Sequence, residues 1–206
     1  MKIVQFVKQL NNTELGKGGT HDTYVLIPNE LDITDIFTKT NEPIEFHDAD
    51  NTETVVARNT VGREKRIVGL GQYYRSRDLA AGDEIVFERQ SGYEGSNYIV
   101  RVVKHPENLV FQKAKSGFEI LTPERLNMAK SWSEQSEDDF SIDFLCSAKK
   151  RNDSPDTTDF YDISINGKSL LESYSGKDIG LISFEKKRIK ISSFYGWKKY
   201  IFETEE

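Results

Sequence analysis

Short segments in which apolar and polar residues alternate constrain the fold of this chain more than any other feature. The pattern is clearest in EIVFERQ, residues 84–90, where Ile85 and Phe87 fall on one face, and in NYIVRVV, residues 97–103. Alternation with a period of two is typical of a strand that buries one face. A glycine-containing loop separates the two segments, so we expect them to pair as antiparallel strands.

Further strands are predicted through the first half of the chain. Residues 3–7, 24–27, 44–48 and 53–60 have strand patterns, whereas the apolar residues of NELDITDIFTK, residues 29–39, fit a short helix loosely. We therefore expect residues 1–110 to form one compact, mainly β domain.

The second half mixes helix and strand signals. HPENLVFQKAKSG, residues 105–117, has the character of a connection, and Thr122, Pro123 and Glu124 then mark the start of a helix. We expect residues 115–206 to form a small α+β domain, whose role the pattern does not indicate. Its predicted strands are residues 140–148, 160–165, 179–184 and 187–194, with one helical turn over residues 169–174.

Composition places the chain among globular proteins. Of its 206 residues, 36% are apolar and 30% charged, and no stretch approaches the roughly 18 apolar residues that a membrane helix requires. Cys146 is the single cysteine and the first residues lack a signal-peptide pattern, so we expect a cytoplasmic protein with no membrane partner. His21, His47 and His105 are scattered without cysteine neighbours, which predicts no metal site.

One basic stretch stands out because the net charge of the chain is −6. Residues 61–77 contain a single acid, Glu64, among several cations. The stretch is either a solvated surface loop or a site for a polyanion in an otherwise acidic protein. Its cations, with the arginine just upstream, are Arg58, Arg63, Lys65, Arg66, Arg75 and Arg77.

Two glycine-containing loops in the first half carry residue types that suit DNA. Glycine lets the backbone approach a phosphate closely, and charged or amide side chains can bond base edges. The candidates are Lys17, His21, Asp22 and Tyr24 in residues 16–24, and Arg58, Asn59, Arg63, Glu64, Lys65 and Arg66 in residues 57–67.

Glu64 is the informative member of the second loop, since a loop that only binds phosphate gains nothing from an acid. Its carboxylate accepts a hydrogen bond from cytosine N4 in one interpretation and orients a neighbouring arginine in another. In a third interpretation it forms an ordinary surface ion pair with Lys65 or Arg66, which contributes little.

Three ordered motifs resemble a known family. GKGGTHDTYVLIP, GREKRI and GDEIVFERQSGYEGSNYIVRVV together resemble the N-terminal effector-binding domain of EcoRII-type restriction endonucleases, a relative of the plant B-three DNA-binding domain. The resemblance covers about residues 1–108 and implies a seven-stranded open pseudobarrel, followed here by the small α+β unit. It also implies two arms that grip the major groove of double-stranded DNA: the N-arm, residues 17–24, and the C-arm, residues 58–66.

The resemblance also implies roles for residues and partners. His21 takes the place of a DNA-contacting histidine of the N-arm, and Glu64, Lys65 and Arg66 take the place of a Glu-Lys-Arg run in the C-arm. Gly62 and Arg63 depart from the family pattern, so the target sequence need not be the one EcoRII recognises. The implied function is target recognition in a restriction or phage-defence system, with the chemistry supplied by a nuclease domain or subunit and no cofactor in this chain.

A different class of function is a complete, small metal-dependent endonuclease with its active site in residues 115–206. Asp162, Glu185 and Lys187 have the required order, an acid followed by Glu-x-Lys, whose carboxylates would hold Mg²⁺. One Glu-x-Lys is expected by chance in a chain with this much glutamate and lysine. We therefore assign no catalytic residue, and Mg²⁺ enters only under this alternative.

The segment FEKKRIKISSFYGWKKYIF, residues 184–202, interleaves cations with aromatic residues. Such a mixture can hold nucleic acid by charge and stacking. Alternatively, Ile189 and Ile191 face a core while the lysines are solvated. A third interpretation is a partner or dimer surface that uses Trp197 and Tyr200.

Overall fold

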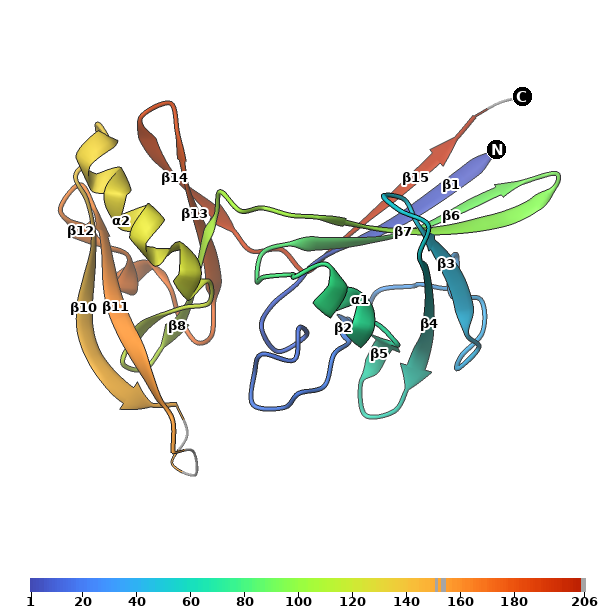
Figure 1. Cartoon of the computed structure of the whole chain (residues 1–206), viewed down its shortest axis with the longest axis horizontal. Helices are drawn as coiled ribbons and strands as arrows, with labels where there is room; N and C mark the ends of the chain where they lie inside the picture. The colour runs from blue at the N-terminus through green and yellow to red at the C-terminus, as the bar shows by residue number, and fades with distance from the viewer. Residues whose placement is uncertain (151, 153–154, 205–206) are drawn as a thin grey trace. The chain divides into compact units, whose positions relative to one another are not determined.

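The computed structural model describes residues 1–150, 152 and 155–204, and the chain folds into two compact units (Figure 1). Unit 1 consists of Met1–Lys104 together with Tyr195–Glu206, and unit 2 of His105–Phe194. Each unit is built on its own sheet, so the expected mainly β fold class is confirmed. No helix in the described ranges has the length and apolar content needed to cross a membrane.

Unit 1 is a curled, open sheet of eight strands in the order β15-β1-β6-β7-β3-β4-β5-β2. The N-terminal part of the chain supplies seven of them, as the pseudobarrel expectation requires, and the C-terminal end supplies the eighth. The elements are β1 (Lys2–Gln9), β2 (Val25–Ile27), β3 (Ile44–Asp48), β4 (Thr54–Val61), β5 (Lys65–Val68), α1 (Gly71–Ser76), β6 (Glu84–Gly92), β7 (Gly95–Val103) and β15 (Trp197–Glu203).

Alternate residues of these strands form an aromatic core. Ile85 and Phe87 are both fully buried, and β6 pairs with β7 in antiparallel register, as their alternation predicts. The ring of Phe87 packs edge-on against Phe46 and Phe37, with centroids 5.3 and 5.7 Å away. Edge-to-face packing of this kind adds to the stabilisation that burial of the rings provides.

Trp197 connects the two edge strands of the open sheet. Its indole ring in β15 packs edge-on against Phe6, with centroids 5.8 Å apart, and its Nε1 donates to the carbonyl oxygen of Leu26 in β2 at 2.8 Å. The N–H of Leu26 donates in turn to Glu14 Oε1 at 2.9 Å. An edge strand has no neighbour for half of its backbone groups. The side chains of Trp197 and Glu14 therefore bond both backbone groups of Leu26 at the free edge of β2. The bond from Trp197 joins the two edge strands of the curled sheet.

Residues 195–206 thus belong to unit 1, although their sequence pattern placed them in a domain of residues 115–206. The strand β15 pairs with β1 from Lys2↔Glu203 to Lys8↔Trp197. A pairing between the two ends of a chain joins residues that no local pattern relates, so alternation predicts the strand but not its partner.

Two local predictions in unit 1 were wrong. Residues 29–39 form turns instead of a helix, because the apolar residues Ile33, Ile36 and Phe37 span a single turn and all three are buried in the core. The basic stretch is also not a continuous loop. The residues after β5 form the short helix α1, which buries Tyr73 and Tyr74.

Unit 2 is a sheet in the order β10-β11-β9-β8-β13-β14, with β12 paired to β11. The segment expected to be a connection instead forms a hairpin, because Leu109, Val110 and Phe111 are fully buried. The elements are β8 (Leu109–Ala114), β9 (Gly117–Ile120), the 3-10 turn η1 (Pro123–Arg125), α2 (Leu126–Gln135), β10 (Phe140–Lys149), β11 (Thr157–Ile165), β12 (Lys168–Ser169), the 3-10 turn η2 (Leu170–Ser173), β13 (Ile179–Glu185) and β14 (Arg188–Ser193).

The helix α2 lies against this sheet (Figure 1). Its Trp132 is buried, with ring centroids 6.3 Å from Phe140 in β10 and 6.2 Å from Phe184 in β13. Thr122 precedes the helical region as predicted, but its hydroxyl oxygen accepts from the N–H of Val110 at 3.0 Å and caps no helix N–H.

Each unit holds one of the two tryptophans of the chain, which allows the assignment of β15 to be tested. Trp197→Ala should destabilise unit 1 by about 2–3 kcal/mol, since it removes a half-buried ring and the donor to Leu26. Hydrogen exchange read by mass spectrometry should show faster exchange in β1 and β2 and unchanged exchange in unit 2. The matched control Trp132→Ala should give faster exchange in unit 2 and unchanged exchange in β1 and β2. Loss of protection in unit 2 on changing Trp197 would contradict the assignment.

Candidate nucleic-acid interface

The sheet places the N-arm and the C-arm beside each other. The N-arm leads directly into β2, and the C-arm is the hairpin of β4 and β5 (Figure 1). The strand β2 pairs with β5 in the register Val25↔Ile67, Leu26↔Arg66 and Ile27↔Lys65. Both Val25 and Ile67 are fully buried. The two loops that sequence analysis selected independently are therefore neighbours on one rigid scaffold.

Three of the predicted residues are in direct contact. The guanidinium carbon of Arg66 lies 4.0 Å from the centroid of the Tyr24 ring, and Arg66 Nε and Nη2 donate to Glu64 Oε2 at 3.0 and 2.7 Å. The hydrogen bonds that Arg66 donates to Glu64 raise the pKa of the Arg66 guanidinium, and burial raises the pKa of the Tyr24 hydroxyl. Glu64 thus holds Arg66 over the Tyr24 ring. The contact fits both the interpretation that Glu64 orients a neighbouring arginine and the interpretation that it forms a surface ion pair with Arg66, since the two side chains are 47% and 36% exposed.

The arginine keeps hydrogen-bonding capacity in this arrangement. Its bonds to Glu64 use Nε and Nη2. Within the described part of the chain Nη1 makes no hydrogen bond. A planar, always charged guanidinium fixed in this way suits recognition of a base edge or a phosphate.

The base of the N-arm is held by a buried ion pair that the sequence did not reveal. Glu14 Oε2 lies 3.2 Å from Lys8 Nζ, and both side chains are over nine-tenths buried. Burial raises the pKa of the Glu14 carboxyl, while Lys8 and the N–H groups of Leu26 and Asn11 act against that rise. Breaking such a buried pair leaves an uncompensated charge inside the protein. The only sequence signal was one acid within the polar stretch NNTELG.

Gly16 has to be glycine for the N-arm to turn as it does. Its φ of +71° lies in the left-handed region, and a Cβ at this position would come 2.9 Å from the carbonyl oxygen of His21. Any other residue would push the loop away from its own return strand. The glycine sets the conformation of this arm, in which His21 and Asp22 are exposed.

A surface cavity of about 410 Å³ brings the N-arm and α1 together. Lys17, His21 and Arg75 line it, with Asp78 as its acid. Lys17 Nζ donates to the carbonyl oxygen of Leu79 at 2.7 Å, which ties the arm to the segment that follows the helix. Arg75 therefore joins the N-arm side of the site, although it is far from the N-arm in sequence.

The C-arm presents two different faces. In β4, Val55, Ala57 and Asn59 are buried, while Arg58 lies on the exposed face. Thr60 pairs with Arg66, so Arg66 shares the face of Arg58, whereas Lys65 shares the face of Asn59. Asn59 and Lys65 line a second cavity of about 370 Å³. The buried Asn59 Oδ1 has no hydrogen-bond partner among the described residues.

The cations of the basic stretch divide into available and engaged groups. The side chains of Arg58, Arg63 and Arg75 are exposed and form no hydrogen bond or ion pair with the described residues. Arg77, by contrast, is paired with the fully buried carboxylate of Asp48 and lies over the Tyr73 ring. Its guanidinium serves the fold of unit 1.

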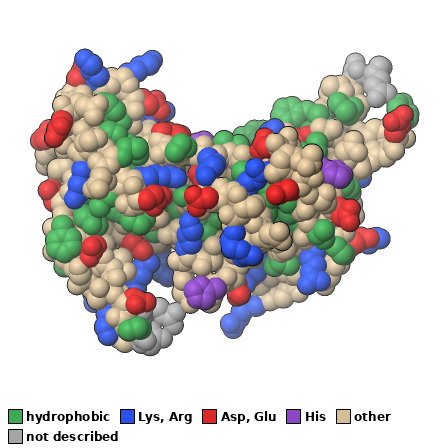
Figure 2. Space-filling model, in the orientation of Figure 1, with side chains coloured by type: hydrophobic (Ala, Val, Ile, Leu, Met, Phe, Trp, Pro, Cys, Tyr) green, Lys and Arg blue, Asp and Glu red, His purple; other side chains and the backbone are tan. Residues whose placement is uncertain are grey.

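Charge alone does not mark this interface on the molecular surface. On the face drawn in Figure 2, Lys and Arg side chains are scattered among Asp and Glu side chains. What distinguishes the arms is that some of their cations, such as Arg58 and Arg63, have no side-chain partner among the described residues.

The residues of the nuclease alternative are not brought together. Asp162 lies in β11 and Glu185 in β13, and the sheet order places β9 and β8 between these strands. Adjacent strands are about 4.8 Å apart, so the two carboxylates are roughly three strand spacings from each other. Asp162 accepts from Ser169 Oγ at 2.6 Å, and Glu185 pairs with Lys190 at 3.3 Å. Lys187 lies in the turn between β13 and β14.

Other side chains that could bind a metal give a similar result. In the part of the chain that the structure describes, no group of three His, Cys, Asp or Glu side chains is arranged to hold a metal ion.

The segment of residues 184–202 is divided between the two units. Ile189 packs against the core of unit 2, whereas Ile191 is 40% exposed, so the expectation that both face a core holds for one of them. Trp197 packs against the core of unit 1, and Tyr200 is exposed. These cations and aromatic rings do not form one continuous strand surface.

Comparisons with known proteins add little to this geometry. No protein-family model and no curated protein matches the chain. Among solved structures, the chain is similar to one from an Arabidopsis FUS3–DNA complex, with 18% identity and a TM-score of 0.35 over 48% of this chain and 94% of that one. It is also similar to the N-terminal domain of Helicobacter pylori LlaJI.R1, with 13% identity and a TM-score of 0.35 over 50% and 82% of the two chains. These scores are too low to carry an argument.

Proposed function

We propose that unit 1 binds double-stranded DNA in a sequence-specific manner, with the N-arm and the C-arm in the major groove. The observation that carries the proposal is the pairing of β2 with β5, which sets the two arms side by side with Arg66 fixed between Tyr24 and Glu64. A two-stranded ribbon such as β4 and β5 fits into a major groove about 12 Å wide.

The arms divide the work between phosphates and bases. The side chains of Arg58 and Arg63 are exposed and have no partner among the described residues, as cations that contact phosphates should be. Arg66, Glu64 and His21 are the groups proposed to contact base edges. Arg66 can donate from its remaining nitrogen, the second oxygen of Glu64 can accept, and the exposed imidazole of His21 can do either, depending on its tautomer.

The biological setting we propose is target recognition in a restriction or phage-defence system. The support is the resemblance of three ordered motifs in residues 16–103 to EcoRII-type recognition domains. The cleavage chemistry would then come from a nuclease domain or subunit. The separation of Asp162 from Glu185 favours this arrangement over a nuclease site inside unit 2.

The first prediction concerns the salt dependence of binding. Each phosphate contact contributes about −0.9 to the slope of log affinity against log salt, because binding releases counterions. Arg58→Ala combined with Arg63→Ala should therefore flatten the slope by about 2 and weaken binding to every duplex alike. Fluorescence anisotropy over a salt series measures both quantities.

The matched control removes two cations of unit 1 outside the arms, Lys39 and Arg101, by Lys39→Ala with Arg101→Ala. This control has the same net charge as the Arg58→Ala, Arg63→Ala variant, but its log affinity should keep the wild-type dependence on log salt. Equal slopes for both double variants and the wild type would mean that the arms do not contact phosphates.

The second prediction concerns sequence discrimination. After selection of a preferred site from random duplexes, His21→Ala and Glu64→Ala should each reduce discrimination at particular base pairs, by about 1–3 kcal/mol per lost base contact. Affinity for random DNA should change little for His21→Ala and rise slightly for Glu64→Ala, since a negative charge leaves the surface. Competition between the selected site and its single-base variants gives the measurement.

Glu45→Ala provides the control, because Glu45 is an exposed acid of β3 outside the arms. It should leave the ranking of sites unchanged. If all three variants ranked the sites as the wild type does, the arms would be an electrostatic grip that does not recognise sequence.

A further inference from the structure

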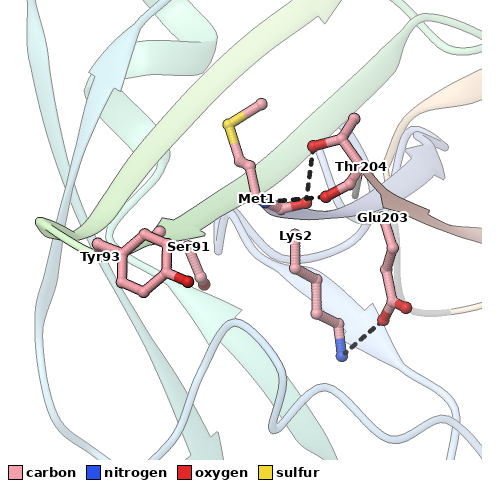
Figure 3. Close-up of a pocket in the computed structure, with 7 residues that line it drawn as sticks. Met1, Lys2, Ser91, Tyr93, Glu203 and Thr204 are labelled. Carbon is pink, nitrogen blue, oxygen red and sulfur yellow. Dashed lines mark hydrogen bonds and ion pairs between the residues drawn. The ribbon is translucent and has the colours of Figure 1, made fainter. Parts of the chain in front are cut away.

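The strand β15 has an open edge. It ends the sheet order, with β1 as its partner on one side. Met1 and Thr204 exchange both backbone hydrogen bonds, at 3.2 and 3.0 Å, beside the ion pair of Lys2 with Glu203 (Figure 3). Hydrogen-bonded and non-bonded pairs alternate along an antiparallel ladder. The backbone groups of Lys199, Ile201 and Glu203 therefore point away from β1, toward the open edge.

The open edge carries apolar side chains on both faces. Tyr200 and Phe202 are 41% and 51% exposed on one face, with their rings stacked 6.3 Å apart, and Ile201 is 50% exposed on the other. Soluble proteins usually protect such edges with lysines. Here Lys198 lies over the Tyr195 ring at 4.0 Å and Lys199 is bound to Asp35 at 2.5 Å, both near the start of the strand. Tyr200, Ile201 and Phe202 carry no charge, and Glu203, paired with Lys2, follows them.

The sequence of this edge is complementary to itself. A two-fold axis between two antiparallel strands places one residue opposite its own copy. With Ile201 at the axis, Tyr200 lies opposite Phe202 of the second copy. Glu203 lies opposite Lys199 of the second copy, whose ammonium group also binds Asp35 within its own chain. Aromatic pairs and opposite charges directly across strands both stabilise a sheet. The outward backbone groups of Lys199, Ile201 and Glu203 are the ones that this register bonds.

The neighbouring register lacks these matches. With Tyr200 at the axis, Lys199 would lie opposite Ile201 of the second copy and Lys198 opposite Phe202. Glu203 would lie opposite Trp197 of the second copy. In that register each cation therefore faces an apolar side chain, and the acid faces no cation.

We propose that β15 pairs with β15 of a second copy of this chain, in the antiparallel register centred on Ile201. The two curled sheets become one continuous sheet across the two-fold axis. This dimer places two copies of unit 1, each with its own pair of arms, in a fixed relation. The proposal rests on the edge of β15 alone and stands whether or not the arms bind DNA.

The first test removes a backbone N–H group on the open edge of β15 and leaves the edge paired with β1 intact. Ile201→Pro removes an N–H that points to the open edge, so the ladder with β1 keeps its bonds. Sedimentation of the wild type should give twice the 23.6 kDa mass of the chain. The Ile201→Pro variant should dissociate at concentrations at least about tenfold higher, since two symmetric backbone bonds are lost. Val56→Lys, at an equally exposed apolar residue of β4, should leave the dimer intact.

The second test fixes the register and does not depend on the proline variant folding. In a Cys146→Ser background, Ile201→Cys should form a disulfide-linked dimer on mild oxidation, because opposite Cα atoms lie within disulfide range. Tyr200→Cys alone and Phe202→Cys alone should cross-link poorly, while a mixture of these two should cross-link well. A wild type that sediments as one chain at every concentration, or cross-linking without this pattern, would overturn the proposal and leave the edge for a different partner.

Discussion

The contact of Trp197 with Leu26 is the interaction on which unit 1 depends. The open sheet has β15 at one end of its order and β2 at the other, and the indole N–H of Trp197 bonds the carbonyl oxygen of Leu26 across that opening. Glu14 bonds the N–H of the same residue from the base of the N-arm. A strand of three residues at the edge of a sheet has little stability of its own. The C-terminal strand and a buried carboxylate therefore keep β2, and with it the N-arm, in position against the C-arm.

The electrostatics of the arms follow from this fixed geometry. An acidic chain can bind a polyanion only where cations are free of internal partners. Within the part of the chain that the structure describes, the side chains of Arg58 and Arg63 meet that condition and Arg77 does not. Arg66 is intermediate, because Glu64 and Tyr24 hold it in one orientation while its Nη1 makes no hydrogen bond with the described residues. Holding a guanidinium in place before binding reduces the entropy lost when it contacts DNA.

Sequence patterns predicted the local structure of unit 1 better than its closure. The alternation in residues 84–103 gave both strands and their pairing, and the arms were located from residue types and the family resemblance. Alternation alone could not show that β15 joins β1 or that α1 interrupts the basic stretch, because both depend on contacts between distant residues. The partner of Arg77 was equally hidden, whereas the pairing of Glu64 with Arg66 was among the interpretations that the sequence allowed. Six similar cations in sequence became available or engaged according to whether folding placed a buried acid such as Asp48 beside them.

The proposed function requires that both arms contact DNA in the same complex. The direct measurement is hydrogen exchange of the whole protein with and without an excess of its selected duplex, resolved by peptide. We predict that residues 16–24 and 58–66 both become protected on binding, while residues 105–194 exchange as in the free protein. Protection confined to residues 105–194, or in only one arm, would contradict the proposed interface.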